Sequence, residues 1–180
     1  MSIFVIILLI IAAIIVIILV AAAAMPGEYT IQKEVIINKP VQDVFDYVKF
    51  SMNQNHYNKW WMMDPNSRKE YVGTDATPGF TMKWDSDNKQ AGKGEQEIKK
   101  IIDGKRIDYE IRFIKPFRGT STSFMETGPV PGNQTRVVWA FGGKRNFGMR
   151  IFHMLFNLKK MLGKDLQASL NNLKTILEKQ

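Results

Sequence analysis

The 180-residue chain has no cysteine and only two histidines, His56 and His153. The absence of cysteine excludes disulfides, thiolate nucleophiles and thiolate metal ligands. The histidines form no HxH or HExxH pattern, and neither a GxSxG motif nor a glycine-rich phosphate loop is present. The sequence therefore predicts no metal and no cofactor. His153 is left as a weak catalytic candidate, because it lies in the apolar segment before the last predicted helix.

Charged side chains are also missing from the first 27 residues, where Ile3 to Met25 form an unbroken apolar run. As a helix, at about 1.5 Å per residue, this run would be roughly 34 Å long, enough to cross a bilayer core. It is longer than the apolar region of a usual signal peptide, and no Lys or Arg precedes it. We expect residues 1–25 to be a retained, single-pass transmembrane anchor. A cleaved signal peptide is the alternative, since Ala21 to Ala24 offer small residues for cleavage.

The formal net charge of +8 falls entirely on residues 26–180, which we expect to form one domain. The basic residues are dispersed apart from small groups such as Lys99-Lys100 and Lys159-Lys160, and no nucleic-acid-binding motif is visible. The first interpretation of this charge is a solvated basic surface, and the second is proximity to a membrane, because a tethered basic domain is attracted to anionic headgroups. We expect a membrane as partner of the anchored chain and no nucleic acid. Lys33 and Lys39 follow the apolar run and weakly favour a domain on the cytoplasmic side of the membrane, so the side of the membrane stays open. The sequence does not indicate the oligomeric state.

The domain begins with the patterns of short strands and helices. Residues 28–38 alternate apolar and polar side chains as a strand does, and Lys39-Pro40 then opens a helix with an apolar stripe. A second helical turn is predicted at residues 51–55. Turn residues separate six further predicted strands, at residues 69–73, 80–84, 92–102, 106–114, 119–126 and 135–142.

The last predicted element is a long helix over residues 158–180. Leu162, Leu166, Leu170, Leu173 and Leu177 recur at helical spacing and form one apolar stripe that needs a surface to pack on. A break near residues 157–159 keeps Lys159 off this stripe; the alternative is that Lys159 faces a cavity. Together the elements predict an α+β fold, a curved seven-stranded antiparallel sheet with the long helix and two short helices on one side.

Several of these segments resemble the helix-grip fold of the START-like, or SRPBCC, superfamily, which includes the pollen allergens. The chain is similar to the bacterial polyketide cyclase/dehydrase and lipid transport family. The matching segments span the domain: residues 36–40 (IINKP), 44–48 (VFDYV), 59–60 (KW), 92–95 (GKGE), 112–117 (RFIKPF), 135–139 (TRVVW) and 163–174. The resemblance implies a cavity between the sheet and the long helix that takes a hydrophobic ligand, and it carries no universal catalytic signature.

Aromatic and other apolar side chains are the candidates for lining that cavity. The predicted ligand-binding residues are Trp60, Trp61, Met82, Trp84, Tyr109, Phe113, Phe124, Trp139, Phe141, His153, Leu162 and Leu166. Methionines supply adaptable apolar volume and are abundant here, at Met52, Met62, Met63, Met82, Met125 and Met161. The competing interpretation is that these residues fill a solid core.

Three functions are compatible with the sequence. The first is a membrane-anchored binding protein for a hydrophobic small molecule, such as a lipid or isoprenoid-like compound. The second is an enzyme of the cyclase or dehydratase type, which would need an acid–base pair inside the cavity. The third is a protein-interaction module, like the co-chaperones that share the fold. A connected apolar cavity favours the first, a converging His–carboxylate pair the second, and a solid core the third.

Overall fold

A computed structural model describes residues 2–88, 91–116 and 118–179 of the chain. For three residues inside a helix, His153, Leu155 and Phe156, it describes the backbone and not the side chain. The candidate His153 side chain therefore lies outside the described part of the structure.

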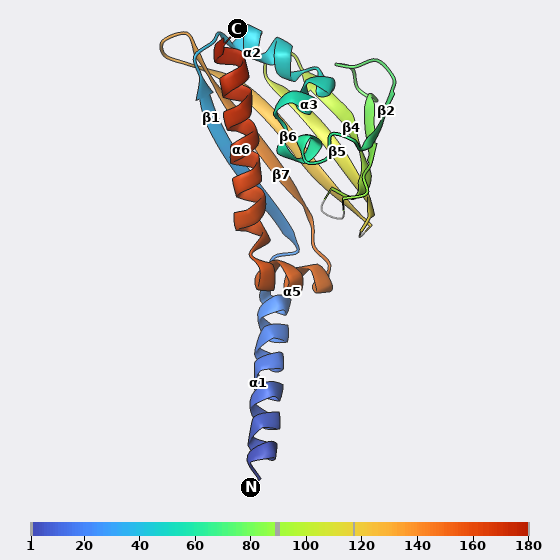
Figure 1. Cartoon of the computed structure of the whole chain (residues 1–180). Coiled ribbons are helices and arrows are strands. Elements are labelled where there is room, and N and C mark those ends of the chain that lie inside the picture. The colour runs from blue at the N-terminus through green and yellow to red at the C-terminus, as the bar shows by residue number, and fades with distance from the viewer. Residues whose placement is uncertain (1, 89–90, 117, 180) are drawn as a thin grey trace.

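The core of the fold is one seven-stranded sheet in which every neighbouring pair is antiparallel, in the order β1-β7-β6-β5-β4-β3-β2 (Figure 1). The strands are β1 (Glu28–Ile37), β2 (Arg68–Val72), β3 (Thr81–Asp85), β4 (Lys93–Ile102), β5 (Arg106–Lys115), β6 (Gly119–Val130) and β7 (Gln134–Lys144). All seven predicted strands are present. The predicted turn after β6 begins too early, because Gly128, Pro129 and Val130 still pair with β7.

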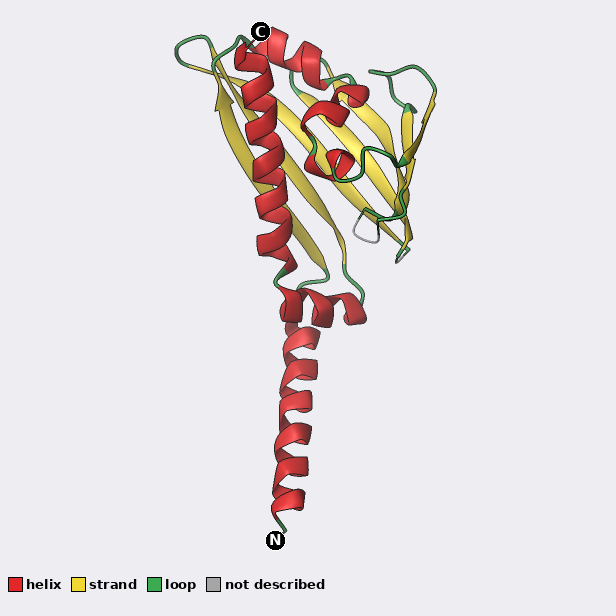
Figure 2. Cartoon of the chain, viewed as in Figure 1, coloured by secondary structure: helices red, strands yellow, loops and turns green. Residues whose placement is uncertain are grey.

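Helices gather on one face of the sheet, as Figure 2 shows with helices in red and strands in yellow. They are α2 (Val41–Val48), the 3-10 turn η1 (Ser51–Asn53), α3 (Gln54–Tyr57), α4 (Lys59–Met62) and the long α6 (Leu158–Lys179). The predicted leucine stripe of α6 is the face that packs on the sheet: Leu166, Leu170 and Leu173 are completely buried and Leu177 nearly so. This confirms the predicted α+β helix-grip architecture.

Gly163 lets the long helix approach the sheet closely. A Cβ atom at this position would lie 3.3 Å from Cε of Lys33 and 3.7 Å from Cγ2 of Ile31, both on β1. The neighbouring break also has a clear backbone cause. Asn157 adopts left-handed angles, with φ 44° and ψ 48°, so the chain turns between α5 (Phe147–Phe156) and α6.

The N-terminal helix α1 (Ile3–Ala24) projects away from the sheet, at the end where α5 lies (Figure 1). Its side chains are apolar and, apart from the buried Ala22 and the partly covered Ile18, exposed. By length and composition α1 could cross a membrane, a test that N-terminal signal sequences also pass.

Candidate functional site

A cavity of about 420 Å³ lies between the inner face of the sheet, α4 and the first turns of α6. Its walls combine strand residues from β3, β4, β5, β6 and β7 with residues from the two helices. The lining residues are Asn58, Trp60, Trp61, Met63, Asp64, Ser67, Trp84, Ala91, Gln96, Ile111, Phe113, Ser123, Trp139, Phe141, Met161, Leu162, Asp165 and Leu166.

Aromatic rings in successive contact form a continuous part of the wall. Trp84 packs edge-on against Trp61, with ring centroids 5.4 Å apart, and against Phe113 at 6.1 Å. Phe141 continues the series, 6.5 Å from Phe113 and 6.4 Å from Trp60. These are the separations at which tilted and edge-to-face aromatic pairs are favourable. The rings therefore support one another and leave apolar surface facing the cavity.

Two of the four indole N–H groups in this wall, those of Trp84 and Trp139, are already satisfied by the protein. Nε1 of Trp84 donates to the carbonyl oxygen of Ala91 at 2.9 Å. Nε1 of Trp139 donates to Oγ of Ser123 at 3.0 Å, and that hydroxyl donates to the carbonyl oxygen of Ala140 at 2.8 Å. Because these donors are occupied, neither tryptophan needs a polar partner from a ligand.

The remaining polar groups of the cavity are few. Asn58 is buried, donates to Oε1 of Gln54 and caps α4 by accepting from the amide of Trp60. Gln96 is also buried, and its Nε2 has no hydrogen-bond partner among the described residues. Such an amide is a natural contact for one oxygen of a ligand or for a bound water.

Two carboxylates lie at the edge of the cavity, and both are engaged. Asp165 on α6 forms an ion pair with Lys59 on α4. Asp64 accepts hydrogen bonds from the hydroxyl of Ser86 and from the amide of Asn66. These contacts fix the rim of the cavity.

Contacts between α4 and α6 hold the cavity roof in place. Besides the Lys59–Asp165 pair, the amide of Lys59 donates to Oγ of Ser169 at 2.9 Å. Nδ2 of Asn172 donates to the carbonyl oxygen of Tyr57 at 3.2 Å. These contacts join the short helices α3 and α4 to α6 as one cover of the cavity.

Beyond the cavity, the interior is solid and contains two buried tyrosines, Tyr57 and Tyr109. Burial raises the pKa of both phenol groups above the usual value. Both therefore stay protonated near neutral pH, and neither can serve as a general base there.

Eight of the twelve sequence-predicted site residues meet around the cavity: Trp60, Trp61, Trp84, Phe113, Trp139, Phe141, Leu162 and Leu166. Met82 and Tyr109 face the same side of the sheet but are packed in the solid core. Six methionines were named from the sequence as sources of apolar volume for the cavity. Of these, Met63 and Met161 line the cavity, Met82 and Met125 are buried in the core, and Met52 and Met62 are exposed.

Phe124 corrects the sequence analysis. Along β6 the buried residues are Ser121, Ser123, Met125 and Thr127, so Phe124 points to the opposite face of the sheet. There the guanidinium carbon of Arg106 lies 3.7 Å above its ring centroid. Phe124 therefore covers the outer surface and does not line the cavity.

The sequence analysis missed several lining residues. Ile111 had a usable signal, because it alternates with Phe113 on the apolar face of β5. Gln96, Ser123 and Asn58 are polar residues that only the completed fold places against the cavity. Within the described ranges, no three His, Asp or Glu side chains gather as a metal site would require. His56 is exposed and is not among the described lining residues.

Comparison with known proteins agrees with this architecture. A family model described as "polyketide cyclase / dehydrase and lipid transport" matches residues 28–178. No protein with a curated description matches the sequence.

Three solved structures illustrate the likeness of the fold. MLL2253 from Mesorhizobium loti is similar with a TM-score of 0.62 and 14% identity, over 84% of this chain and 98% of that one. Ara h 8.0201 is similar with a TM-score of 0.58 and 12% identity, over 86% and 100%. The Aha1 dimer from Colwellia psychrerythraea is similar with a TM-score of 0.57 and 17% identity, over 83% and 96%.

At these identities the likeness to solved structures concerns the fold alone. The family model, in contrast, covers nearly all of the chain that follows α1. The chain therefore belongs to the polyketide cyclase/dehydrase and lipid transport family.

Proposed function

We propose that the chain is a membrane-anchored binding protein that holds a hydrophobic small molecule, such as a lipid or isoprenoid-like compound, in the cavity beneath α6. The cavity carries this proposal. Its volume of about 420 Å³ falls within the roughly 300–1,000 Å³ usual for small-molecule sites, and its lining is largely apolar. A family and fold typical of ligand-binding domains support the same conclusion.

Anchoring supports a bilayer-soluble ligand in particular. The helix α1 presents an unbroken apolar surface of 22 residues, and no long linker separates it from β1. A cavity tethered at a membrane meets lipid-borne molecules at a raised effective concentration.

Affinity should come from contact with the aromatic wall. The indole donors of Trp84 and Trp139 are internally satisfied, so a largely apolar ligand leaves no buried donor unpaired on these side chains. Gln96 is the polar group best placed to orient such a ligand, through one oxygen atom.

Two observations weigh against the alternatives. The described side chains of the cavity include the carboxylates Asp64 and Asp165 but no histidine, so no His–carboxylate pair converges there. This gives the cyclase or dehydratase hypothesis no acid–base pair among the described residues. A protein-interaction module was expected to have a filled interior, whereas this domain contains a cavity.

Ligand titration with a cavity-filling variant tests the proposal. Residues 26–180 include all of the family match, so this fragment is the appropriate sample for fluorescent fatty acids and isoprenoid quinones. Leu162→Trp would place a large ring in the cavity from α6, and Ile176→Trp adds similar bulk to the same helix away from it.

We expect saturable quenching of tryptophan fluorescence by these probes in the unaltered fragment. Leu162→Trp should weaken binding at least tenfold, while Ile176→Trp should leave it within about threefold. Absence of binding by every apolar probe would refute the proposal and favour an interaction module. Equal binding by both variants would place the probe outside the cavity.

A further inference from the structure

The helix α5 lies across the end of α1, between that helix and the sheet (Figure 1). Hydrogen bonds join the two parts directly. Nη1 of Arg150 on α5 donates to the carbonyl oxygen of Ala23 at 3.2 Å. The amide of Arg145, just before α5, donates to the carbonyl oxygen of Gly27 at 2.7 Å. If α1 spans a bilayer, α5 must therefore lie at the bilayer surface.

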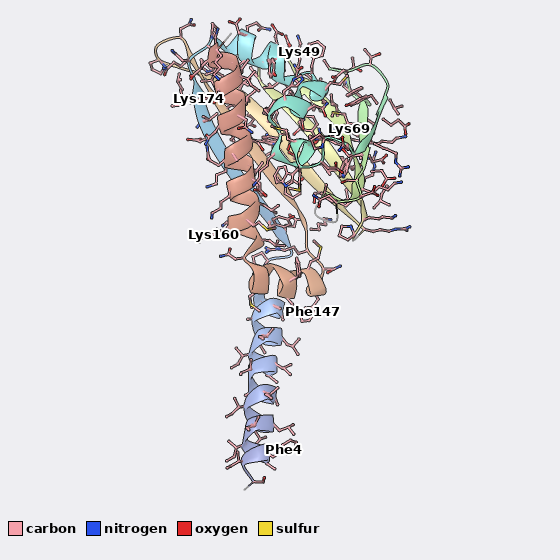
Figure 3. All side chains as sticks on the ribbon, viewed as in Figure 1. Phe4, Lys49, Lys69, Phe147, Lys160 and Lys174 are labelled. Carbon is pink, nitrogen blue, oxygen red and sulfur yellow. The ribbon has the colours of Figure 1, made fainter. Side chains whose placement is uncertain are left out.

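Three large apolar side chains of α5 are exposed within six residues: Phe147 at 46%, Met149 at 39% and Phe152 at 44%. Figure 3 shows Phe147 at the end of α5 farthest from α6, on the side from which α1 extends. Apolar side chains at this level fit the boundary between headgroups and acyl chains, where amphipathic helices lie in the plane of the membrane.

Positive charge is concentrated around the same helix. Residues 143–164 contain six Lys or Arg and no Asp or Glu, so they carry +6 of the chain's net charge of +8. We call Lys144, Arg145, Arg150, Lys159 and Lys160 the basic collar. Among the described residues none of the five forms an ion pair with a carboxylate. The positive charge that looks dispersed in the sequence is thus largely gathered where α1 joins the sheet.

Several cations elsewhere in the domain do form ion pairs with carboxylates. Arg112, for example, contacts Glu95, Glu97 and Glu110 on the outer face of the sheet. In the basic collar, Arg145 and Arg150 donate to the backbone carbonyl oxygens of Glu28 and Ala23, but no described carboxylate neutralises the five charges. The collar therefore suits an external anion. Beside an inserted α1, the nearest anions are the phosphate groups of lipids.

We propose that α5 and the basic collar dock on an anionic bilayer surface, with Phe147 in the interface and the collar cations bound to lipid phosphates. This inference rests on the proposed anchor. It also sets the position of the cavity: β7, which carries Phe141, leads into α5, and the first turn of α6, which carries Met161 and Leu162, leads out of it. The cavity residues nearest to α5 then lie just above the headgroups.

Site-specific labels can test this docking, because the chain has no cysteine of its own. Three single-cysteine variants of the full chain carry an environment-sensitive nitrobenzoxadiazole label: Phe147→Cys on α5, Ile10→Cys inside α1 and Phe50→Cys next to α2. Phe50 is a matched control, since it is 42% exposed and follows closely after α2, the helix that Figure 1 shows at the end of the domain far from α1. The proteins are reconstituted into phosphatidylcholine vesicles with or without phosphatidylglycerol and with doxyl-labelled lipid as quencher.

In vesicles with phosphatidylglycerol, we expect lipid quenching at positions 10 and 147 and none at position 50. Quenching at position 10 combined with an aqueous label at position 147 would overturn the docking proposal and leave the anchor intact. An aqueous label at position 10 would overturn the anchor and the docking proposal with it, but would not affect binding in the cavity.

A charge-matched comparison tests the basic collar. Lys144→Gln, Lys159→Gln and Lys160→Gln together remove three positive charges from it. Lys99→Gln, Lys100→Gln and Lys105→Gln remove three charges at the opposite end of the sheet, at and before the β4–β5 turn. In anionic vesicles the first set should reduce quenching at position 147 at least twofold and the second set should not. Equal quenching for both sets, with no effect of phosphatidylglycerol, would show that the collar binds no anionic lipid.

Discussion

A single glycine determines where the indole of Trp84 lies. A Cβ atom at Gly94 would come within 2.6 Å of two atoms of the Trp84 ring and of the carbonyl oxygen of Arg112. Neither neighbour can shift easily. The carbonyl belongs to the β5 backbone, and the ring is held by its hydrogen bond to the carbonyl oxygen of Ala91. Only glycine therefore allows Trp84 to lie flat on the sheet and form a cavity wall.

We expect Gly94→Ala to displace Trp84 and to destabilise the domain by about 1–3 kcal/mol, as overpacking in a well-packed core does. Ligand binding should weaken as well, since the cavity loses a wall. Urea unfolding and probe titration of residues 26–180 measure the two effects. Gly128→Ala is the control, because a Cβ atom there meets nothing within 4 Å. Equal stability of both variants would contradict the tight packing at Gly94.

On the outer face of the sheet, Glu97 links the domain's stability to pH. Hydrogen bonds from Lys99 and Arg112 lower the pKa of Glu97 below its usual value. A carboxylate with a lowered pKa in the folded state stabilises the protein above its unfolded pKa, and this contribution disappears as the pH falls through the folded value.

The variant Glu97→Gln should therefore lower the Tm at pH 7, where the carboxylate is charged, and have a smaller effect at pH 3. Because Glu97 is near the surface, the difference should be modest. Differential scanning calorimetry of residues 26–180 and of the variant at both pH values measures it. An equally large Tm difference at pH 3 would show that packing, and not the charge, is responsible.

At the level of single residues, aromatic and apolar character predicted eight of the eighteen lining residues of the cavity, and alternation of apolar and polar residues predicted which face of a strand a residue occupies. In β5 it correctly separated Tyr109, Ile111 and Phe113 from Asp108 and Arg112. Phe124 was misassigned because its aromatic character was given more weight than its even-numbered position on β6. Gln96 could not be found in this way, since nothing local distinguishes a buried glutamine from an exposed one.

At the scale of elements, α6 is the helix on which the domain core depends. Leu166 and Leu170 are completely buried beneath it, as the leucine periodicity predicted. Truncating either residue to alanine should cost about 2–5 kcal/mol, through lost burial and an unfilled cavity. Urea unfolding of residues 26–180 measures this cost. Lys164→Ala, on the exposed side of α6, is the control, and a cost below about 0.5 kcal/mol for both leucines would contradict the account.

The junction between α5 and α6 was predictable in position but not in geometry. A helical stripe that includes Lys159 is unfavourable, so a break near Asn157 followed from the sequence. The direction that α5 takes depends on the left-handed backbone of Asn157 and on the bonds of Arg145 and Arg150 to the end of α1. The two hydrogen bonds join residues that lie more than 100 positions apart in the sequence. Local periodicity cannot predict such contacts.

At the scale of the whole molecule, the proposed membrane anchoring requires that α1 is retained in the mature protein. Its apolar surface has no partner in the fold along most of its length, which is expected of a membrane anchor. Intact-mass spectrometry of protein extracted from membranes should give the mass of the chain with residues 3–25 present. A mature N-terminus near Met25 or Pro26 would show that α1 is a cleaved signal peptide.

The overall architecture could be predicted from the sequence because each helix and strand has its own residue pattern. These patterns are the alternating strands, the turn residues between them and the leucine stripe of α6. These patterns alone could not predict the cavity. It is the space that remains where side chains from five strands and two helices do not fill the interior, and its volume depends on all of them together.

Binding of a hydrophobic small molecule in the cavity beneath α6 is tested most directly by native mass spectrometry of the full chain, purified from the membranes of its own host in mild detergent. We expect a bound small molecule of defined mass that organic solvent extracts as a hydrophobic compound. The Leu162→Trp variant should lose this adduct, and Ile176→Trp should retain it. A chain without any adduct, or an adduct that Leu162→Trp retains in full, would contradict binding in the cavity beneath α6.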